Sequence, residues 1–67
     1  MKISVNKQGK EVPEKVNLIS LLEHLSITDK SSVAIAVNQQ VIPRQKWDEK
    51  IIKENDEVLL ITAYEGG

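Results

Sequence analysis

The sequence predicts an α+β domain, with a mixed sheet of about five strands and one main helix packed on one face. Three observations support this fold class. Several short segments alternate polar and apolar residues, a single stretch has the leucine spacing of an amphipathic helix, and the final apolar segment is apolar on both faces. A chain of 67 residues has room for one small core. We therefore expect one domain over residues 1–64, followed by a flexible tail of residues 65–67.

The chain is predicted to begin with a β-hairpin. Residues 2–6 alternate polar and apolar side chains, which is the pattern of a half-buried strand. A turn is expected at residues 7–10, where Gly9 can take a positive φ. The chain then returns as a second strand over residues 11–13. Because Pro13 has no N–H to donate, this strand should lie at the edge of the sheet or end there.

One amphipathic helix is predicted to follow and to end at about Leu25. Asn17 can cap it by accepting a hydrogen bond from a free backbone N–H of the first turn. Val16 and Leu21 occupy the positions of a hydrophobic staple. The apolar face repeats at i, i+3, i+4 and i+7, and its members are Leu18, Leu21, Leu22 and Leu25.

Two more strands are expected after the helix. The first covers residues 32–37 and alternates branched residues with alanines. A turn at residues 38–40 then leads to a short strand at residues 41–42, which Pro43 ends.

The last strand is predicted to be central in the sheet. Before it, residues 44–57 look irregular, with a short helical turn near residues 47–50. Asn55 and Asp56 mark a tight turn, and residues 58–64 then form a strand that is apolar on both faces. A strand of this composition is usually central in a sheet.

One helix can cover only one face of this sheet, so the other face is left open. The residues predicted to pack under the helix are Val33, Ile35, Val37, Val58, Leu60 and Thr62. The residues predicted on the open face are Ala34, Ala36, Leu59 and Ile61. Exposed apolar area of this kind often marks a partner site, so these four are candidate docking residues. Alternatively, the irregular segment around Trp47 folds over the open face.

Composition excludes several classes of function. The net charge is −1, whereas nucleic-acid binders usually carry a clear basic excess. With no cysteine, the chain has no disulfide, no thiolate nucleophile and no Cys-ligated metal. No apolar run approaches the ~20 residues that span a bilayer, and the first residues read as a strand and not as a secretory signal. We therefore expect a soluble, cytoplasmic protein that binds neither nucleic acid nor membranes.

The charge is distributed unevenly along the chain. Residues 1–47 carry seven Lys or Arg and four Asp or Glu, a balance of +3, and residues 48–67 carry two Lys and six acidic residues, a balance of −4. A basic surface on a partner would attract this acidic end. An ordinary solvated surface explains the same distribution.

The sequence ends in Tyr64-Glu65-Gly66-Gly67. Glycine has no Cβ, so such a tail can enter a narrow channel and present its carboxylate to an enzyme. In an extended conformation, residues 64–67 would reach roughly 13 Å beyond the domain. A frayed terminus is the alternative for any glycine-rich end. We expect Gly66 and Gly67 to be disordered in the isolated protein.

The element order and this ending match the ubiquitin-like β-grasp architecture, and within it the sequence resembles the thiamin-biosynthesis sulfur carrier family, ThiS. The resembling residues are Ala36-Val37-Asn38-Gln39-Gln40-Val41-Ile42-Pro43-Arg44, Trp47, Asp56-Glu57-Val58-Leu59-Leu60 and Gly66-Gly67. The pattern Asn-x-x-x-Val/Ile-Pro-Arg-x-x-Trp is fairly specific, whereas every ubiquitin-like carrier shares a terminal Gly-Gly. One departure is Asn55, where many relatives have glycine; asparagine tolerates the same left-handed conformation.

The resemblance implies a carrier without catalytic residues, cofactor or metal, which is a monomer on its own. An ATP-dependent enzyme of the ubiquitin-activating type would adenylate the Gly67 carboxylate. Sulfur from a persulfide donor protein would displace AMP to leave a thiocarboxylate, which would donate sulfur to thiazole synthase in thiamin biosynthesis. The runner-up is the small subunit of molybdopterin synthase. A ubiquitin-like protein modifier and an interaction module with an inert tail are further alternatives.

Four single residues carry more than one interpretation. His24 is expected at the surface or its boundary, with a role as a ligand or base as the alternative. Trp47 is expected as a cap over the small core, with a stacking role as the alternative. Arg44 is either a docking contact or a surface residue that binds a neighbouring acid or carbonyl. Glu65 either steers the tail or is simply solvated.

Overall fold

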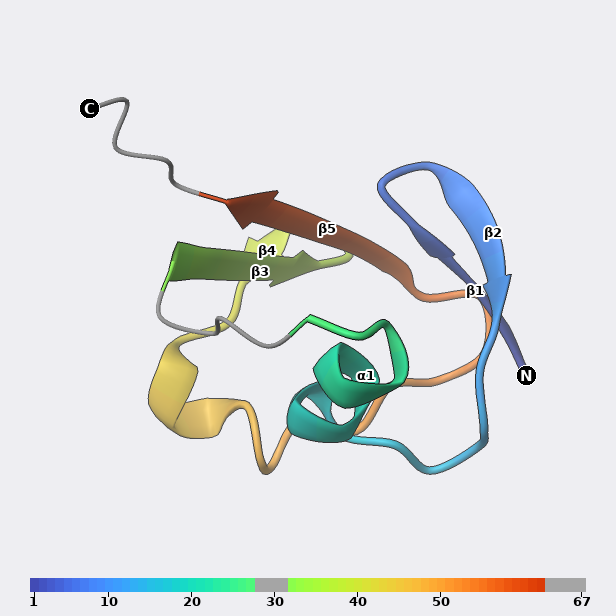
Figure 1. The fold of residues 1–67 in the computed structure, drawn as a ribbon, viewed down its shortest axis with the longest axis horizontal. Helices are drawn as coiled ribbons and strands as arrows, with labels where there is room; N and C mark the ends of the chain where they lie inside the picture. The colour runs from blue at the N-terminus through green and yellow to red at the C-terminus, as the bar shows by residue number, and fades with distance from the viewer. Residues whose placement is uncertain (28–31, 63–67) are drawn as a thin grey trace.

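The structure is a computed structural model that describes residues 1–27 and 32–62, and it contains a five-stranded sheet with one main helix on one face (Figure 1). The elements are β1 (Lys2–Val5), β2 (Gln8–Glu11), α1 (Leu18–His24), β3 (Val33–Val37), β4 (Gln40–Val41), the 3₁₀ helix η2 (Arg44–Lys46) and β5 (Glu57–Thr62). The strand order is β2-β1-β5-β3-β4. Since β5 runs parallel to β1 and antiparallel to β3, the sheet is mixed. The predicted fold class and the central position of the last strand are confirmed.

The first hairpin has a different turn from the predicted one. Asn6 and Lys7 turn the chain, with φ of 51° and 70°, and β2 already begins at Gln8. A two-residue turn with two positive φ values suits the twist of the paired strands, and asparagine tolerates that conformation. The predicted turn at residues 7–10 and strand at residues 11–13 are therefore wrong. Gly9 lies within β2 and pairs with Ser4.

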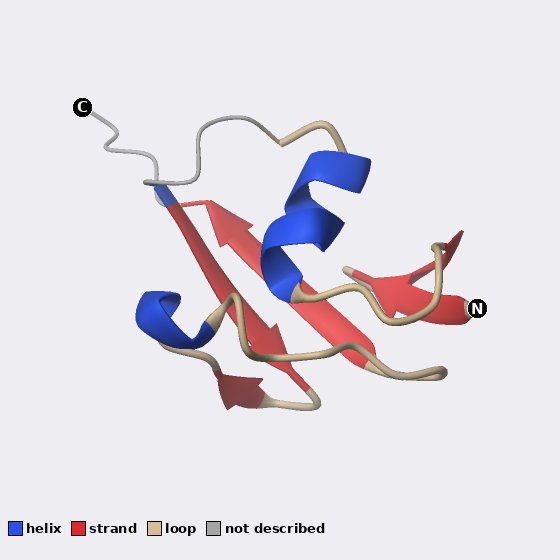
Figure 2. Cartoon of the chain, turned by 90° about the horizontal axis from the view of Figure 1, so that it is seen from below, coloured by secondary structure: helices blue, strands red, loops and turns tan. Residues whose placement is uncertain are grey.

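The helix agrees with its prediction. Asn17 is the N-cap, and its Oδ1 accepts a hydrogen bond of 2.8 Å from the N–H of Ser20. Leu18, Leu21 and Leu22 are buried against the sheet, and Leu25 is the C-cap. Viewed from below the sheet, α1 lies across the strands (Figure 2).

The pairing of β3 with β5 fixes the two faces of the sheet as predicted. Ile35 pairs with Leu60 and Val37 with Val58, and both pairs belong to or pack against the core under α1. The intervening pairs, Ala34 with Ile61 and Ala36 with Leu59, lie on the opposite face. The final strand is described only as far as Thr62. Residues 63 and 64, which the sequence also assigned to it, lie outside the described residues.

The segment between β4 and β5 begins differently from its prediction. A 3₁₀ turn forms at Arg44–Lys46, directly after Pro43. The helical turn predicted near residues 47–50 follows it, because the carbonyl of Lys46 accepts hydrogen bonds from the N–H groups of Glu49 and Lys50. Proline holds φ near −60° and so favours a turn immediately after it. The second hairpin is also shifted by one residue, because Asn38 and Gln39 alone form its turn and β4 occupies Gln40–Val41.

Candidate functional site

The open face of the sheet carries a continuous group of apolar side chains, which we call the apolar patch. Its members are Ala34, Ala36, Val41, Leu59 and Ile61. They are cross-strand neighbours, since Ala36 pairs with both Leu59 and Val41 and Ala34 pairs with Ile61. Ile61 is 57% exposed and Val41 is 68% exposed, whereas Leu59 is half-buried and Ala36 is only 7% exposed. Ala36 therefore contributes little accessible surface to the patch. The four predicted docking residues thus lie on one face of the sheet, and the structure adds Val41, which pairs with Ala36 in the β3–β4 hairpin.

The segment around Trp47 does not cover this patch. Trp47 is 2% exposed and belongs to the core cluster beneath α1. Its Nε1 donates a 2.9 Å hydrogen bond to the carbonyl of Ile42, and its own carbonyl accepts one from Leu18. In Figures 1 and 2, η2 also lies on the side of the sheet that carries α1. The alternative that this segment folds over the open face is therefore wrong, whereas the expected role of Trp47 in the core is confirmed.

Arg44 lies apart from the apolar patch. It begins η2, and its guanidinium carbon is 5.3 Å from the centroid of the Trp47 ring, a cation–π contact at the surface. The side chain therefore packs on the residue that closes the core on the α1 side. A docking role for Arg44 would use a different surface from that of Ile61 and its neighbours.

The start of β5 is held by a group of hydrogen bonds that we call the base network, formed by Asn38, Lys53, Asp56 and Glu57. Asn38 Nδ2 donates to Asp56 Oδ1 at 3.1 Å, and Asn38 Oδ1 accepts from the Glu57 N–H at 2.9 Å. Asp56 Oδ2 accepts from the Lys53 N–H at 2.8 Å. Asn38, which the sequence identified only as a motif residue, therefore connects the β3–β4 turn to the beginning of β5.

The other end of β5 stays paired with β3 as far as Thr62 but loses its neighbouring strand on the β1 side. On the β1 side, the pairing stops at Val5 opposite Val58, and Asn6 donates its N–H to the carbonyl of Val58. The next N–H on that side, that of Leu60, donates to the side-chain Oδ1 of Asn6 at 2.8 Å. The strand thus passes the end of β1 before it leads into the C-terminal residues.

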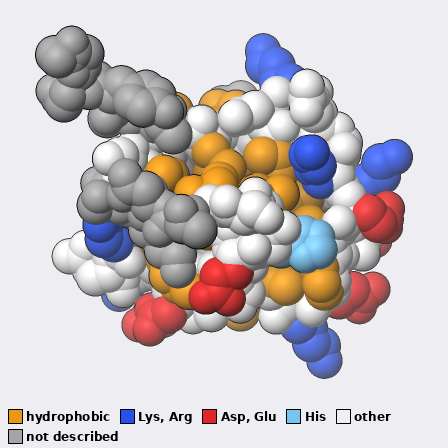
Figure 3. Space-filling view, in the orientation of Figure 1, with side chains coloured by type: hydrophobic (Ala, Val, Ile, Leu, Met, Phe, Trp, Pro, Cys, Tyr) orange, Lys and Arg blue, Asp and Glu red, His pale blue; other side chains and the backbone are white. Residues whose placement is uncertain are grey.

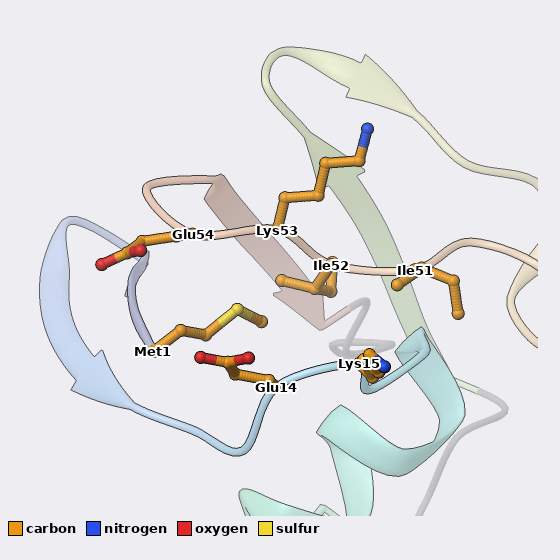
Figure 4. Close-up of a pocket in the computed structure, with 7 residues that line it drawn as sticks. All are labelled: Met1, Glu14, Lys15, Ile51, Ile52, Lys53 and Glu54. Carbon is orange, nitrogen blue, oxygen red and sulfur yellow. The ribbon is translucent and has the colours of Figure 1, made fainter.

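A pocket of about 300 Å³ lies at the opposite end of the molecule from this exit (Figure 4). Met1, Glu14, Lys15, Ile51, Ile52, Lys53 and Glu54 line it. The Met1 and Ile52 side chains point toward each other, while Lys53 points away. None of the predicted site residues lines this pocket.

The remaining predictions concern His24 and the tail. His24 is exposed in the last turn of α1, as expected. Within residues 1–27 and 32–62, no group of three or more His, Cys, Asp or Glu could hold a metal ion, and no helix is long and apolar enough to cross a membrane. Glu65, Gly66 and Gly67 lie outside the described residues, so their predicted roles and disorder stay predictions.

Comparison with known proteins gives a consistent result. The model of the ThiS family matches residues 2–67. The chain is 33% identical over its full length to the full-length sulfur carrier protein ThiS of Escherichia coli strain K12. It also resembles the crystal structure of the thiamine biosynthesis protein ThiS from Geobacter metallireducens, with a TM-score of 0.86 and 28% identity over 100% of this chain and 99% of that one. The solution structure of a thiamine biosynthesis protein from the same organism gives a TM-score of 0.83 at 28% identity, with 100% and 88% coverage.

Proposed function

The chain belongs to the ThiS family of sulfur carriers for thiamin biosynthesis, and we propose that the carboxylate of Gly67 is the group on which it carries sulfur. The observation that supports this site is the match along residues 2–67, which includes the terminal Gly66-Gly67. In this role the protein is a co-substrate of other enzymes and contributes no catalytic residue. Residues 1–64 form the docking domain, and residues 65–67 are the part that enters the enzymes.

The chemistry requires an activated terminal carboxylate. A carboxylate is a poor acyl electrophile, so an adenylating enzyme joins a Gly67 oxygen to the α-phosphate of ATP and releases pyrophosphate. The terminal sulfur of a protein persulfide then attacks the acyl carbon, and AMP leaves with the bonding electrons. A thiol cleaves the resulting S–S bond and leaves the thiocarboxylate. Thiazole synthase receives that sulfur.

The arrangement of β5 suits this function. The strand is central in the sheet, its start is fixed by the base network, and its other end leads directly into the C-terminal residues. Five residues follow Thr62, which span at most roughly 17 Å when extended. That length allows Gly67 to enter a recessed active site while the domain stays outside.

We assign the docking of these enzymes to the apolar patch, with Arg44 as a further contact on the adjoining side. The patch lies on β5, on its neighbour β3 and on β4 beyond it, so a partner bound there would be close to the origin of the tail. Acidic residues in the last third of the chain, among them Asp56 and Glu57, would favour a partner whose surrounding surface is basic.

The decisive experiment is intact-mass spectrometry after incubation with ATP, a persulfide source and the candidate adenylating enzyme. We expect a mass gain equal to the replacement of one oxygen by sulfur, and no gain when Gly67 is deleted. An unchanged mass, with an enzyme that is active on another carrier, would contradict the proposal. Capture of high-mass conjugates from cells would instead indicate a protein modifier.

A further inference from the structure

The end of β5 presents backbone hydrogen-bonding groups along its β1 side, where the described strands leave it without a neighbour. Backbone N–H and C=O groups of alternate residues in a strand point to opposite sides. Glu57 bonds toward the β3–β4 turn through Asn38, whereas Val58 and Leu60 bond toward β1 through Asn6. By this alternation, the N–H of Thr62 also points to the β1 side.

β1 no longer lies beside this part of β5. The two strands share only the pairs of Ser4 with Glu57 and Val5 with Val58, after which β1 turns into β2. Figure 1 shows the β1–β2 hairpin diverging from the second half of β5. We call the Leu60 carbonyl and the Thr62 N–H the exit edge. Within residues 1–27 and 32–62, no strand pairs with it.

The surroundings of the exit edge are apolar on both faces of the sheet. Ile61 is largely exposed on the open face, and Leu60 is only partly buried on the α1 face. Figure 3 shows hydrophobic side chains gathered in the middle of this side of the molecule, with charged side chains around the rim. A strand added at the edge would therefore find apolar neighbours for its alternate side chains above and below the sheet.

We propose that the exit edge binds an extended segment of the adenylating enzyme, which adds to the sheet as a strand beside β5. The unpaired N–H and C=O select an extended backbone, and the apolar neighbours select hydrophobic side chains at alternate positions. The adenylating enzyme is the occupant because it must reach Gly67, and the five residues after Thr62 keep Gly67 within roughly 17 Å of the exit edge. This inference rests on the proposed function, and it adds a second contact to the apolar patch.

Proline at position 62 tests the hydrogen bond directly. Thr62→Pro removes the N–H that faces the exit edge and leaves the bonds between Ile61 and Ala34 in place. Thr62→Ala is the matched control, because it changes the same side chain and keeps the N–H. We expect Thr62→Pro to bind the adenylating enzyme about fivefold more weakly than Thr62→Ala. Equal affinities of the two variants would overturn the proposal.

Amide hydrogen exchange tests the same contact in the unsubstituted chain. In the free protein the Thr62 amide should exchange faster than that of Leu60, which already has Asn6 as its acceptor. In the saturated complex we expect the exchange of Thr62 to slow by about tenfold or more. Unchanged exchange in a complex that still adenylates Gly67 would refute the added strand and leave the proposed function intact. Failure of the wild-type chain to be adenylated would instead contradict the proposed function.

Discussion

The two ends of β5 are held in different ways, and the difference suits the function proposed for the residues that follow the strand. At its start, both side-chain and backbone groups of Asn38 bind Glu57, and the carbonyl of Asp56 accepts the N–H of Ser4. At its end, on the β1 side, a single side chain, Asn6, replaces the neighbouring strand. The base network holds the start of the strand, while no described strand pairs with the exit edge.

The largest expected effect comes from removing the tail beyond the exit. Deletion of Gly66 and Gly67 should abolish adenylation and thiocarboxylate formation, because it removes the carboxylate at its required reach. The free energy of unfolding should stay unchanged, since a glycine has no side chain that could pack in the core. Intact-mass spectrometry and urea denaturation measure the two outcomes. A truncated chain that still carried sulfur would show that Gly67 is not the acceptor.

At the base, Asn38→Ala should lower the free energy of unfolding by about 2–3 kcal/mol. The change removes both side-chain hydrogen bonds of Asn38 and places alanine at a φ of 53°. Asn38→Gly is the control, because it loses the same hydrogen bonds but glycine adopts a positive φ without cost. It should be about 1 kcal/mol more stable than Asn38→Ala. Urea denaturation gives both values. Equal stability of Asn38→Ala and the wild type would show that the base network does not hold β5.

On the open face, Ile61→Ser should weaken binding of the adenylating enzyme by about tenfold and change stability by less than about 1 kcal/mol. Ile61 is exposed in the free protein, so its burial occurs only in the complex. Ile51→Ser is a matched control, because Ile51 is also exposed, at 44%, but it lines the pocket at the opposite end. Isothermal titration calorimetry of each variant with the adenylating enzyme measures the loss of affinity. Equal losses for the two would argue against docking on the apolar patch.

The sequence predicted the elements whose signal lies in side-chain pattern. The leucine spacing of α1 and the apolar β5 follow directly from what each surface must bury. The helix, the central strand and the placement of four of the five patch residues on the open face were therefore predicted correctly. The turns were not. Lys7 and Gln39 take positive φ without being glycine or asparagine, because the strand pairing on either side requires a two-residue turn. That requirement depends on the register and is not visible in the local sequence.

The role of Asn38 illustrates the same limit at the candidate site. Its partners Asp56 and Glu57 are 18 and 19 residues away in the sequence, and only the adjacency of β3 and β5 brings them together. The sequence resemblance identified Asn38 as a motif residue but did not show that its side chain holds the start of β5. Val41 was missed for a related reason, since its exposure depends on the short pairing of β4 with β3.

The smallest expected effect concerns Arg44, which lies near neither end of β5. Arg44→Ala should lower the free energy of unfolding by about 0.5–1 kcal/mol, because the cation–π contact with Trp47 is lost at an exposed position. Arg44→Lys keeps the charge but loses the planar group. Its free energy of unfolding should therefore lie between those of the wild type and Arg44→Ala. Urea denaturation gives these stabilities, and calorimetry with each partner enzyme tests docking separately. If Arg44→Ala loses more binding free energy than folding free energy, the docking surface extends around β4 to η2. If its affinity for the partner enzymes is unchanged, docking is confined to the open face.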